Sequence, residues 1–474
     1  MNFVTRAQLF QDLSKALEAG QYDAAPSTLV QGGALQIEHI SPVLYNVGFQ
    51  DRDMVLTTLL SEKPVKATLV QFDRQLSYGH FGGSAQLEGA VGQEDTGDFV
   101  RVTTPMAYYS QMRKSTIVAD AVDTVDGVSA TDRQSEGAAK VIAGDLEFDS
   151  FRGMDDFSNG GVFDGNPFAM ADLPNMRGMF LQVRQSDSVN SPSSHDLMFD
   201  EYGSDESIDI PLNDFLNQDV IENAKMRAGL NFSQASQLIT DPRCLSQYNK
   251  ISYSISRVIL GNSPQDATGS DLNKQWTSGG PTNIKPSRFL SGKTIPGRPR
   301  PNGPNFPTAL AAADSAVAAT PTPFVAGEVY QYYVTAGNEI GESTKSPTAS
   351  VTIAASRNIV TLTITAPAGT VRYFNVYRTI ANGSKPRFIG RVKNSGGATT
   401  TFIDLGNRLP GFVTSILLDD ESAEYAELKP YSRLKLGIHE LAKPEAFFAF
   451  RTLKVMQPRK NVLISNCDGQ YIQN

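Results

Sequence analysis

The first regular pattern in the chain is an amphipathic repeat close to its N-terminus. Within residues 5–20, apolar side chains recur at helical spacing, charged side chains occupy the other faces, and Gly20 ends the run. The apolar positions are Val4, Leu9, Phe10, Leu13 and Leu17. We expect a short helix that packs either on its own domain or, as an arm, on a neighbouring subunit.

Between Lys66 and Val125 the pattern changes to the alternation typical of β-strands. Two such runs, residues 66–79 and 99–122, flank a stretch at 80–98 that is rich in glycine and acidic residues. The alternation predicts a long, hairpin-like extension. Because a two-stranded hairpin buries too little apolar surface to be stable alone, it should lie on a partner subunit.

Apolar residues at helical spacing predict two further helices. The first has Ser129 or Thr131 as its N-cap and ends near Gly153. The second occupies residues 211–229, with Pro211 before its first turn and Gly229 at its end. Their apolar faces carry Ala138, Val141, Ile142 and Leu146, and Leu212, Phe215, Leu216 and Ala224. Residues 237–248 then predict a strand, a turn and the start of a helix.

The last third of the chain separates into three segments by composition. Residues 281–322 are rich in proline and glycine, which predicts a linker or an extended surface tether. Residues 323–411 contain short β runs at turn-punctuated intervals, typical of an immunoglobulin-like or fibronectin-type sandwich. Residues 412–474 return to a mixed pattern with a strand pair broken by Pro458. The sandwich is therefore expected to be an insertion into a body built from both sides of it.

Composition limits the classes of function. A chain of 474 residues should form two to three structural units, and its net charge of -8 argues against binding nucleic acid through phosphate neutralisation. Cys244 and Cys467 lie far apart in sequence and give no disulfide framework. The N-terminus lacks the apolar region of a secretion signal, and no window approaches eighteen apolar residues. We therefore expect neither secretion nor membrane insertion.

A search for catalytic or ligand-binding patterns predicts none. The Gly-Lys-Thr at residues 292–294 has Ser287 in place of the first Walker glycine, and Pro296 prevents the helix that a phosphate loop requires. The acidic stretches 145–157 and 199–210 do not match a calcium-loop register and are expected to be solvated. The four histidines lie in separate segments without metal-ligand spacing: His39, His80, His195 and His439. We therefore predict no catalytic residue, no cofactor and no metal site; the chain is not expected to be an enzyme.

The order of these patterns resembles one family, the major capsid proteins of tailed double-stranded DNA bacteriophages with the Hong Kong ninety-seven type fold. Residues 82–122 resemble its extended loop, with a return strand that ends near Val122, and residues 130–153 resemble its spine helix. Residues 210–250 resemble its axial domain, and residues 447–466 the returning strand of its peripheral domain. The fibronectin-like modules of some relatives are similar to residues 332–343 and 374–383.

The resemblance implies an α+β fold with an inserted all-β, immunoglobulin-like sandwich. The implied segments are an N-terminal arm (1–60), an extended loop with flanking strands (61–126), a peripheral domain with the spine helix (127–205), an axial domain (206–280), a linker (281–322), the inserted domain (323–411) and a return to the axial and peripheral domains (412–474). Some relatives crosslink a loop lysine to an asparagine. Lys63, Lys66 and Lys114 lie around this loop, but the sequence identifies no asparagine partner.

The resemblance also implies partners and a location. Copies of the chain would form the pentamers and hexamers of an icosahedral shell in the virion, assembled in the host cytoplasm around non-specifically bound double-stranded DNA, without a membrane. A portal and a decoration protein are implied partners. A separate scaffolding protein is expected, because the β-type loop begins near residue 66 and leaves no room for a long helical scaffold before it.

Two other functions were weighed. The chain could be a tail or fibre protein whose sandwich binds the host surface, or a secreted polysaccharide hydrolase, which the missing secretion signal disfavours. Deletion of residues 323–411 should distinguish a shell protein from a fibre protein. A shell protein should still assemble without this segment, whereas a fibre protein should lose host binding.

Overall fold

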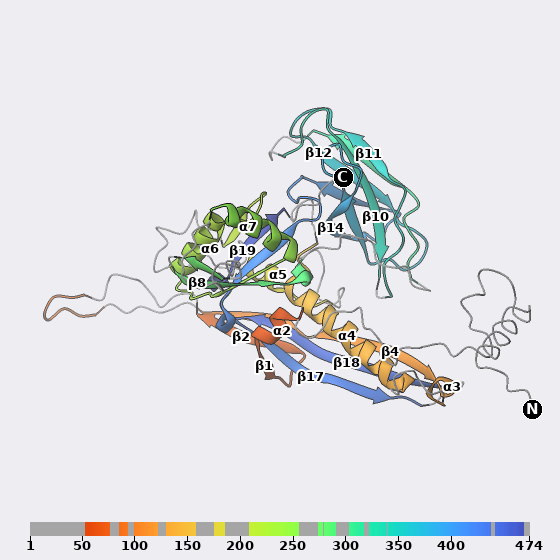
Figure 1. Ribbon diagram of the computed structural model, residues 1–474, viewed down its shortest axis with the longest axis horizontal. Coiled ribbons are helices and arrows are strands. Elements are labelled where there is room, and N and C mark those ends of the chain that lie inside the picture. The colour runs from red at the N-terminus through yellow and green to blue at the C-terminus, as the bar shows by residue number, and fades with distance from the viewer. Residues whose placement is uncertain are drawn as a thin grey trace, which may run out of the picture.

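The computed structural model shows an α+β body beside a separate β domain (Figure 1). It describes residues 53–75, 85–92, 99–121, 129–157, 175–184, 208–255, 274–277, 279–290, 303–316, 322–338, 340–437 and 441–468. The predicted N-terminal helix at residues 5–20 and the four histidines lie outside these residues, as does most of the acidic stretch 199–210. The α+β class predicted from the sequence is confirmed.

A long four-stranded sheet forms one half of the body. Its strand order is β1-β17-β18-β4, so it joins segments from the beginning and the end of the chain. The bounds are Ser61–Pro64 for β1, Ala423–Lys435 for β17, Ala442–Val455 for β18 and Ala107–Thr116 for β4. β1 runs parallel to β17, whereas the other pairs are antiparallel. The predicted interruption at Pro458 is confirmed, since η6 (Pro458–Lys460) separates β18 from the next strand.

The helix α4 (Ala130–Phe151) lies along one face of this sheet (Figure 1). Ser129 caps it by accepting a hydrogen bond from the backbone N–H of Asp132, as predicted, and the helix ends before Gly153, which has a φ of 36°. Its C-terminal end meets the short buried helix α5 (Met179–Arg184). A Cβ atom at Gly178 would lie 2.7 Å from the Phe151 carbonyl oxygen, so glycine is required for this close approach.

A six-stranded sheet forms the other half of the body, with the order β5-β19-β16-β6-β8-β7. Its strands are β5 (Asp209–Pro211), β19 (Val462–Cys467), β16 (Val413–Leu418), β6 (Gln237–Thr240), β8 (Gly280–Pro286) and β7 (Lys274–Thr277). Two helices, α6 (Gln218–Leu230) and α7 (Pro242–Ile255), contribute to the same core. The predicted succession of strand, turn and helix at residues 237–248 is confirmed. Segments from both sides of the β domain meet here, as expected for an insertion.

The β domain consists of two sheets around one core. One sheet has the order β11-β10-β13-β14 and the other β15-β12-β9. Their strands are β9 (Leu310–Ser315), β10 (Val329–Gly337), β11 (Ala349–Thr352), β12 (Ile359–Thr365), β13 (Tyr373–Arg378), β14 (Arg387–Lys393) and β15 (Thr399–Asp404). Val334, Leu362 and Phe374 belong to the core between them. The predicted β runs all occur, while assignment of the domain to the immunoglobulin class stays a prediction.

The predicted linker at 281–322 is wrong at both ends. Residues 280–286 form β8 inside the six-stranded sheet, where Ile284 is buried, and the turn η4 (Arg288–Leu290) buries Leu290. Near the other end, β9 pairs with β12 along its whole length. The prolines and glycines obscured two short strands, β8 and β9, which pair with the distant strands β6 and β12, and such pairing cannot be detected from local composition.

Two other predicted elements have different boundaries. The return strand does not reach Val122, because β4 ends at Thr116 and the short helix α3 (Ile117–Ala121) follows, with the Thr116 hydroxyl accepting from the Ala119 N–H. The helix predicted at 211–229 begins only at Gln218. Asn217 caps it by accepting from the Val220 N–H, whereas Pro211 belongs to β5.

Candidate assembly surface

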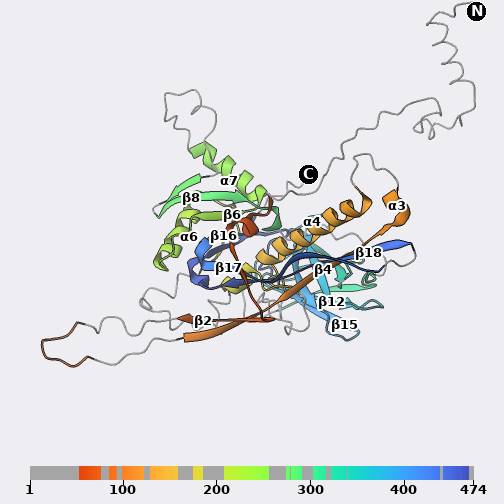
Figure 2. The same ribbon diagram turned by 90° about the horizontal axis from the view of Figure 1, so that it is seen from below.

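The predicted hairpin extension is present as a two-stranded ribbon of β2 (Leu69–Gln75) and β3 (Phe99–Pro105). The strands are antiparallel and pair from Leu69 with Pro105 to Gln75 with Phe99. Within the described residues they belong to no larger sheet. Figure 2 shows the ribbon leaving the body at one side. Its two strands lie beside the body rather than within either of the body's sheets.

The inner face of the ribbon is fixed to the long sheet. Val70 is buried beside Met106 and Ala426. Arg74 donates a hydrogen bond of 2.7 Å from Nη2 to the Val455 carbonyl oxygen, and the Lys454 ammonium lies 5.0 Å from the centre of the Phe72 ring. These contacts set the direction in which the ribbon leaves the body.

The tip of the ribbon presents apolar side chains to solvent. Residues 85–92 contain a turn in which the Ala90 N–H donates to the Leu87 carbonyl at 3.0 Å, and Gly89 supplies the required φ of 84°. Leu87 is 87% exposed and Val91 is 90% exposed. Both side chains are thus almost entirely open to solvent in the subunit.

The face of the long sheet opposite α4 carries a second apolar surface. Side chains alternate along β4, so that Tyr109 points toward α4 while Tyr108 and Met112 are 51% and 62% exposed on the other side. The Tyr108 ring lies 5.1 Å from that of Phe450, which stacks on Phe448 at 5.3 Å. Cross-strand register adds Leu434 and Ala446. Phe450 itself packs against the cluster of Val70, Met106 and Ala426 at the base of the ribbon. We call the other five residues the open face: Tyr108, Met112, Leu434, Ala446 and Phe448.

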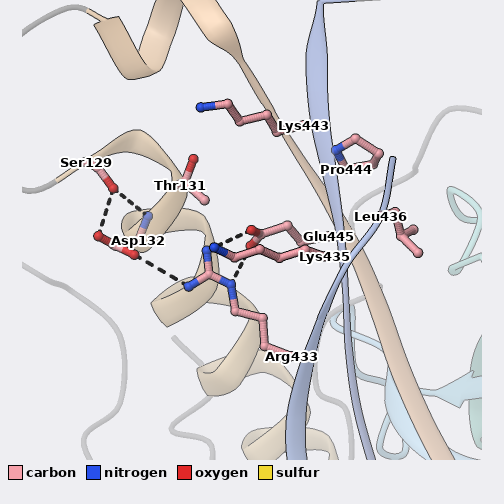
Figure 3. A pocket seen from close by; sticks show the side chains of 9 residues that line it. All are labelled: Ser129, Thr131, Asp132, Arg433, Lys435, Leu436, Lys443, Pro444 and Glu445. Carbon is pink, nitrogen blue, oxygen red and sulfur yellow. Dashed lines mark hydrogen bonds and ion pairs between the residues drawn. The ribbon is translucent and has the colours of Figure 1, made fainter. Parts of the chain in front are cut away.

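A cavity of about 450 Å³ lies where the β17–β18 hairpin meets the start of α4 (Figure 3). Arg433 binds both carboxylate oxygens of Glu445 at 2.7 Å and approaches Asp132 of α4 at 3.6 Å. These groups neutralise one another and tie the hairpin to the helix. The cavity is lined by Ser129, Thr131, Asp132, Arg433, Lys435, Leu436, Lys443, Pro444 and Glu445.

The acidic stretch 145–157 is not the solvated loop expected from the sequence. Asp149, Asp155 and Asp156 are 5%, 1% and 1% exposed, because this stretch forms the end of α4 and the turn between the body and the β domain. Arg152 and Arg408 bind Asp156, and Arg184 and Arg408 bind Asp155. The charges are thus buried in pairs, as buried carboxylates generally are.

Glu147 and Asp149 are exceptions, since their hydrogen-bond donors are uncharged. Glu147 accepts from the backbone N–H groups of Leu56 and Thr57 and from the Thr57 hydroxyl. Asp149 is bound by two side chains. The Tyr109 hydroxyl donates to it at 2.6 Å, and the Asn175 amide donates to both oxygens at 2.9 and 3.1 Å. Burial raises the pKa of Asp149 to about 6, against the opposing effect of these hydrogen bonds.

Asp149→Asn is therefore expected to change the pH dependence of stability. The folded protein holds this proton more tightly than the unfolded chain does, so the contribution of Asp149 is lost as pH rises from about 4 to about 6. The total loss is up to about 3 kcal/mol in the free energy of unfolding. The free energy of unfolding should be measured in urea at pH 4.5 and at pH 7. Relative to the parent, the variant should be more stable at pH 7 than it is at pH 4.5. Asp73→Asn, on the exposed ribbon, is the control, and an equal gain there would contradict the assignment.

The lysines expected near the loop have ordinary surroundings. Lys63 forms an ion pair of 2.5 Å with Glu424, Lys66 is exposed, and Lys114 lies on β4 opposite Pro444. Among the described residues there is no group of three or more His, Cys, Asp or Glu side chains that could hold a metal ion. Where the structure describes the chain, no helix is long and apolar enough to cross a membrane.

Comparison with solved structures gives weak likenesses over most of the chain. A capsid chain of an empty GTA particle has a TM-score of 0.43 at 11% identity, with 94% of this chain and 100% of that chain covered. A chain from Mycobacterium phage Ogopogo has a TM-score of 0.42 at 11% identity, with 91% and 96% covered. No family model matches the sequence.

Among curated proteins, the chain is similar to the major capsid protein of Staphylococcus phage K. The two are 26% identical over 147 residues, which is 31% of this chain and 31% of the relative. The aligned stretch thus spans about a third of either protein. This similarity confirms the resemblance to phage major capsid proteins that the sequence indicated.

Proposed function

We propose that this chain is the major capsid protein of a tailed bacteriophage, a non-enzymatic subunit that assembles with copies of itself into a closed shell in the virion. The observation that carries the proposal is the ribbon, whose tip exposes Leu87 and Val91 away from the body. A monomer would leave these side chains in water. The similarity to a phage major capsid protein supports the same conclusion.

In the proposed assembly, the ribbon of one copy lies on the open face of the next. The turn at residues 85–92 exposes Leu87 and Val91, and the open face exposes Tyr108 and Met112, so that apolar side chains of the two copies can pack with little rearrangement. Such a contact is heterologous, because the ribbon and the open face are different parts of the chain, and it can therefore close into rings. Obligate interfaces of this kind bury about 2,000 Å² or more in total.

Other parts of the proposal follow from the resemblance. The rings are pentamers and hexamers, and a separate scaffolding protein, a portal and a decoration protein are the proposed partners. The net charge of -8 suits a shell that encloses double-stranded DNA without binding it tightly. The proposed segments are those inferred from the sequence, with the inserted β domain now beginning before β9 rather than at residue 323.

The proposal is tested by expressing the chain with and without a scaffolding protein and examining the product by electron microscopy and light scattering. Closed shells, tubes or capsomer rings support it. A monomer or a slender trimer under every condition would contradict it and would favour a fibre protein.

Replacing Leu87 and Val91 together with serine is expected to abolish most of this assembly while leaving the subunit folded. Both side chains are almost fully exposed, so the free energy of unfolding should change by less than about 0.5 kcal/mol. The fraction of protein in particles, measured by sedimentation, should fall at least about tenfold. Val325→Ser, which changes a half-exposed apolar residue of the β domain, is the matched control. Equal assembly by the tip variant and the control would count against the ribbon contact.

A further inference from the structure

The tip of the ribbon carries negative charge as well as apolar side chains. Glu88 lies in the turn between Leu87 and Val91 and is exposed. Residues 75–100 contain no lysine or arginine, but they contain four carboxylates: Glu88, Glu94, Asp95 and Asp98. A surface that binds this tip should therefore combine apolar side chains with positive charge.

The open face has this combination at its border. Side chains alternate along β4, so Lys114 lies on the same side as Met112, two positions further along, and is exposed. The side chains that β4 and β18 direct to this side include no carboxylate: they are Tyr108, Ser110, Met112, Lys114 and Thr116, and Ala442, Pro444, Ala446, Phe448 and Phe450. Lys114 is thus a cation at the end of an apolar strip.

Other cations at this end of the long sheet lie on the side of α4. Arg113 and Lys435 are opposite Glu445 in the strand register, and Arg433 binds the Glu445 carboxylate. Figure 3 shows Arg433 and Glu445 beside the start of α4. Lys114 differs from these cations because it faces away from α4.

Glu88 and Lys114 are far apart within one copy. Lys114 is close to the end of β4, just before α3, and Figure 1 shows α3 and the turn at residues 85–92 at opposite ends of the molecule. In the part of the chain that the structure describes, neither side chain forms an ion pair. A pair between them therefore requires two copies.

The spacing of apolar and charged side chains is compatible on the two surfaces. Leu87 and Glu88 are adjacent, so their Cα atoms are about 3.8 Å apart. Met112 and Lys114 are separated by about 7 Å along one side of their strand. When Leu87 of one copy packs on Met112 of the next, the long side chains of Glu88 and Lys114 can span the remaining distance.

We propose that Glu88 of one copy pairs with Lys114 of the next, and that this pair sets the position of the ribbon on the open face. The proposal rests on the proposed shell function, because it takes the ribbon contact between copies as its starting point. An exposed ion pair adds little affinity, but complementary charges speed the encounter and disfavour wrong registers. The pair should therefore act on the rate of assembly and on its salt dependence.

The test exchanges the two charges and follows assembly by light scattering under conditions in which the parent forms particles. Glu88→Lys alone and Lys114→Glu alone should each slow assembly by about tenfold or more at about 50 mM salt. The two substitutions in one chain should restore the parental rate to within about twofold, since the pair forms again with its signs exchanged. At about 1 M salt, where charges are screened, the single variants should also come within about twofold of the parent.

Glu88→Lys combined with Lys345→Glu is the matched control. Lys345 is an exposed residue of the β domain, so this variant has the net charge of the exchange but no reversed charge on the open face. It should assemble as slowly as Glu88→Lys alone. All the substituted side chains are exposed, so the thermal midpoint of each subunit should stay close to that of the parent.

Three results would overturn the inference and leave the shell function intact. They are parental assembly by Glu88→Lys at low salt, an exchange variant no faster than the single variants, and equal rescue by the exchange and by the matched control. Failure of the parent and of Lys345→Glu to form particles under any condition would instead overturn the proposed function, and this inference with it.

Discussion

Arg152→Met is expected to lower the free energy of unfolding by about 3–5 kcal/mol. Arg152 is fully buried at the end of α4, where its Nε donates to Asp156 at 3.1 Å and its Nη1 donates to the Leu290 carbonyl at 2.7 Å. Burial alone would raise the pKa of Asp156, but Arg152, Arg391 and Arg408 hold it below its ordinary value. Removal of Arg152 leaves a buried carboxylate with too little positive charge around it.

Urea unfolding followed by circular dichroism measures this loss. Lys140→Met on the same helix is the matched control, because Lys140 pairs with the exposed Glu136 at 2.6 Å and should contribute less than about 1 kcal/mol. The double variant Arg152→Met with Asp156→Leu should recover part of the loss, since it removes the stranded charge as well. A loss no larger than that of Lys140→Met would show that the pair does not hold this junction together.

Local patterns in the sequence predicted local structure well. The N-cap at Ser129 depends on a residue three positions away, and the β2–β3 ribbon on two runs joined by one glycine-rich stretch. The strands of the β domain are likewise marked by their own alternation and by the turns between them. In each case the residues that determine the element lie inside or beside it.

Pairings between distant segments could not be predicted in this way. β1 runs parallel to β17, and β8 runs parallel to β6 inside a sheet that also contains the C-terminal strands. Nothing within β8 shows that its proline-rich surroundings belong to a core. The acidic stretch was misjudged for the same reason, because the arginines Arg184 and Arg408 that neutralise it lie elsewhere in the chain.

The candidate assembly surface could be predicted only in part from the sequence. Tyr108 and Met112 lie four positions apart, so a predicted strand places both on one face. Which face of the long sheet is exposed depends on where α4 packs, and this is a property of the tertiary structure.

Deletion of the β domain is expected to destabilise the body, whereas the sequence alone led us to expect that assembly would survive the deletion. Arg408 donates to the Asp155 carbonyl at 3.1 Å and pairs with Asp155 and Asp156 in the body. The Arg391 N–H donates to the Asp156 carbonyl at 2.8 Å. The body's Phe157 also packs against Tyr373 of the domain, with ring centres 6.1 Å apart. The two units therefore share a buried, charged junction rather than a flexible tether.

Two deletions that differ in one residue isolate the charged part of this junction. Removal of residues 303–406 leaves Arg408 in place. The same deletion combined with Arg408→Ala also removes the guanidinium group that pairs with Asp156 of the body. Both should unfold at lower urea concentration than the full chain, and the second should be less stable than the first by about 3 kcal/mol or more. If the two deletion variants were equally stable, the apolar contacts of the junction, and not its ion pairs, would be what stabilises it. Full stability of both would mean that the β domain is an independent appendage, and the loss of host binding would then become the informative measurement.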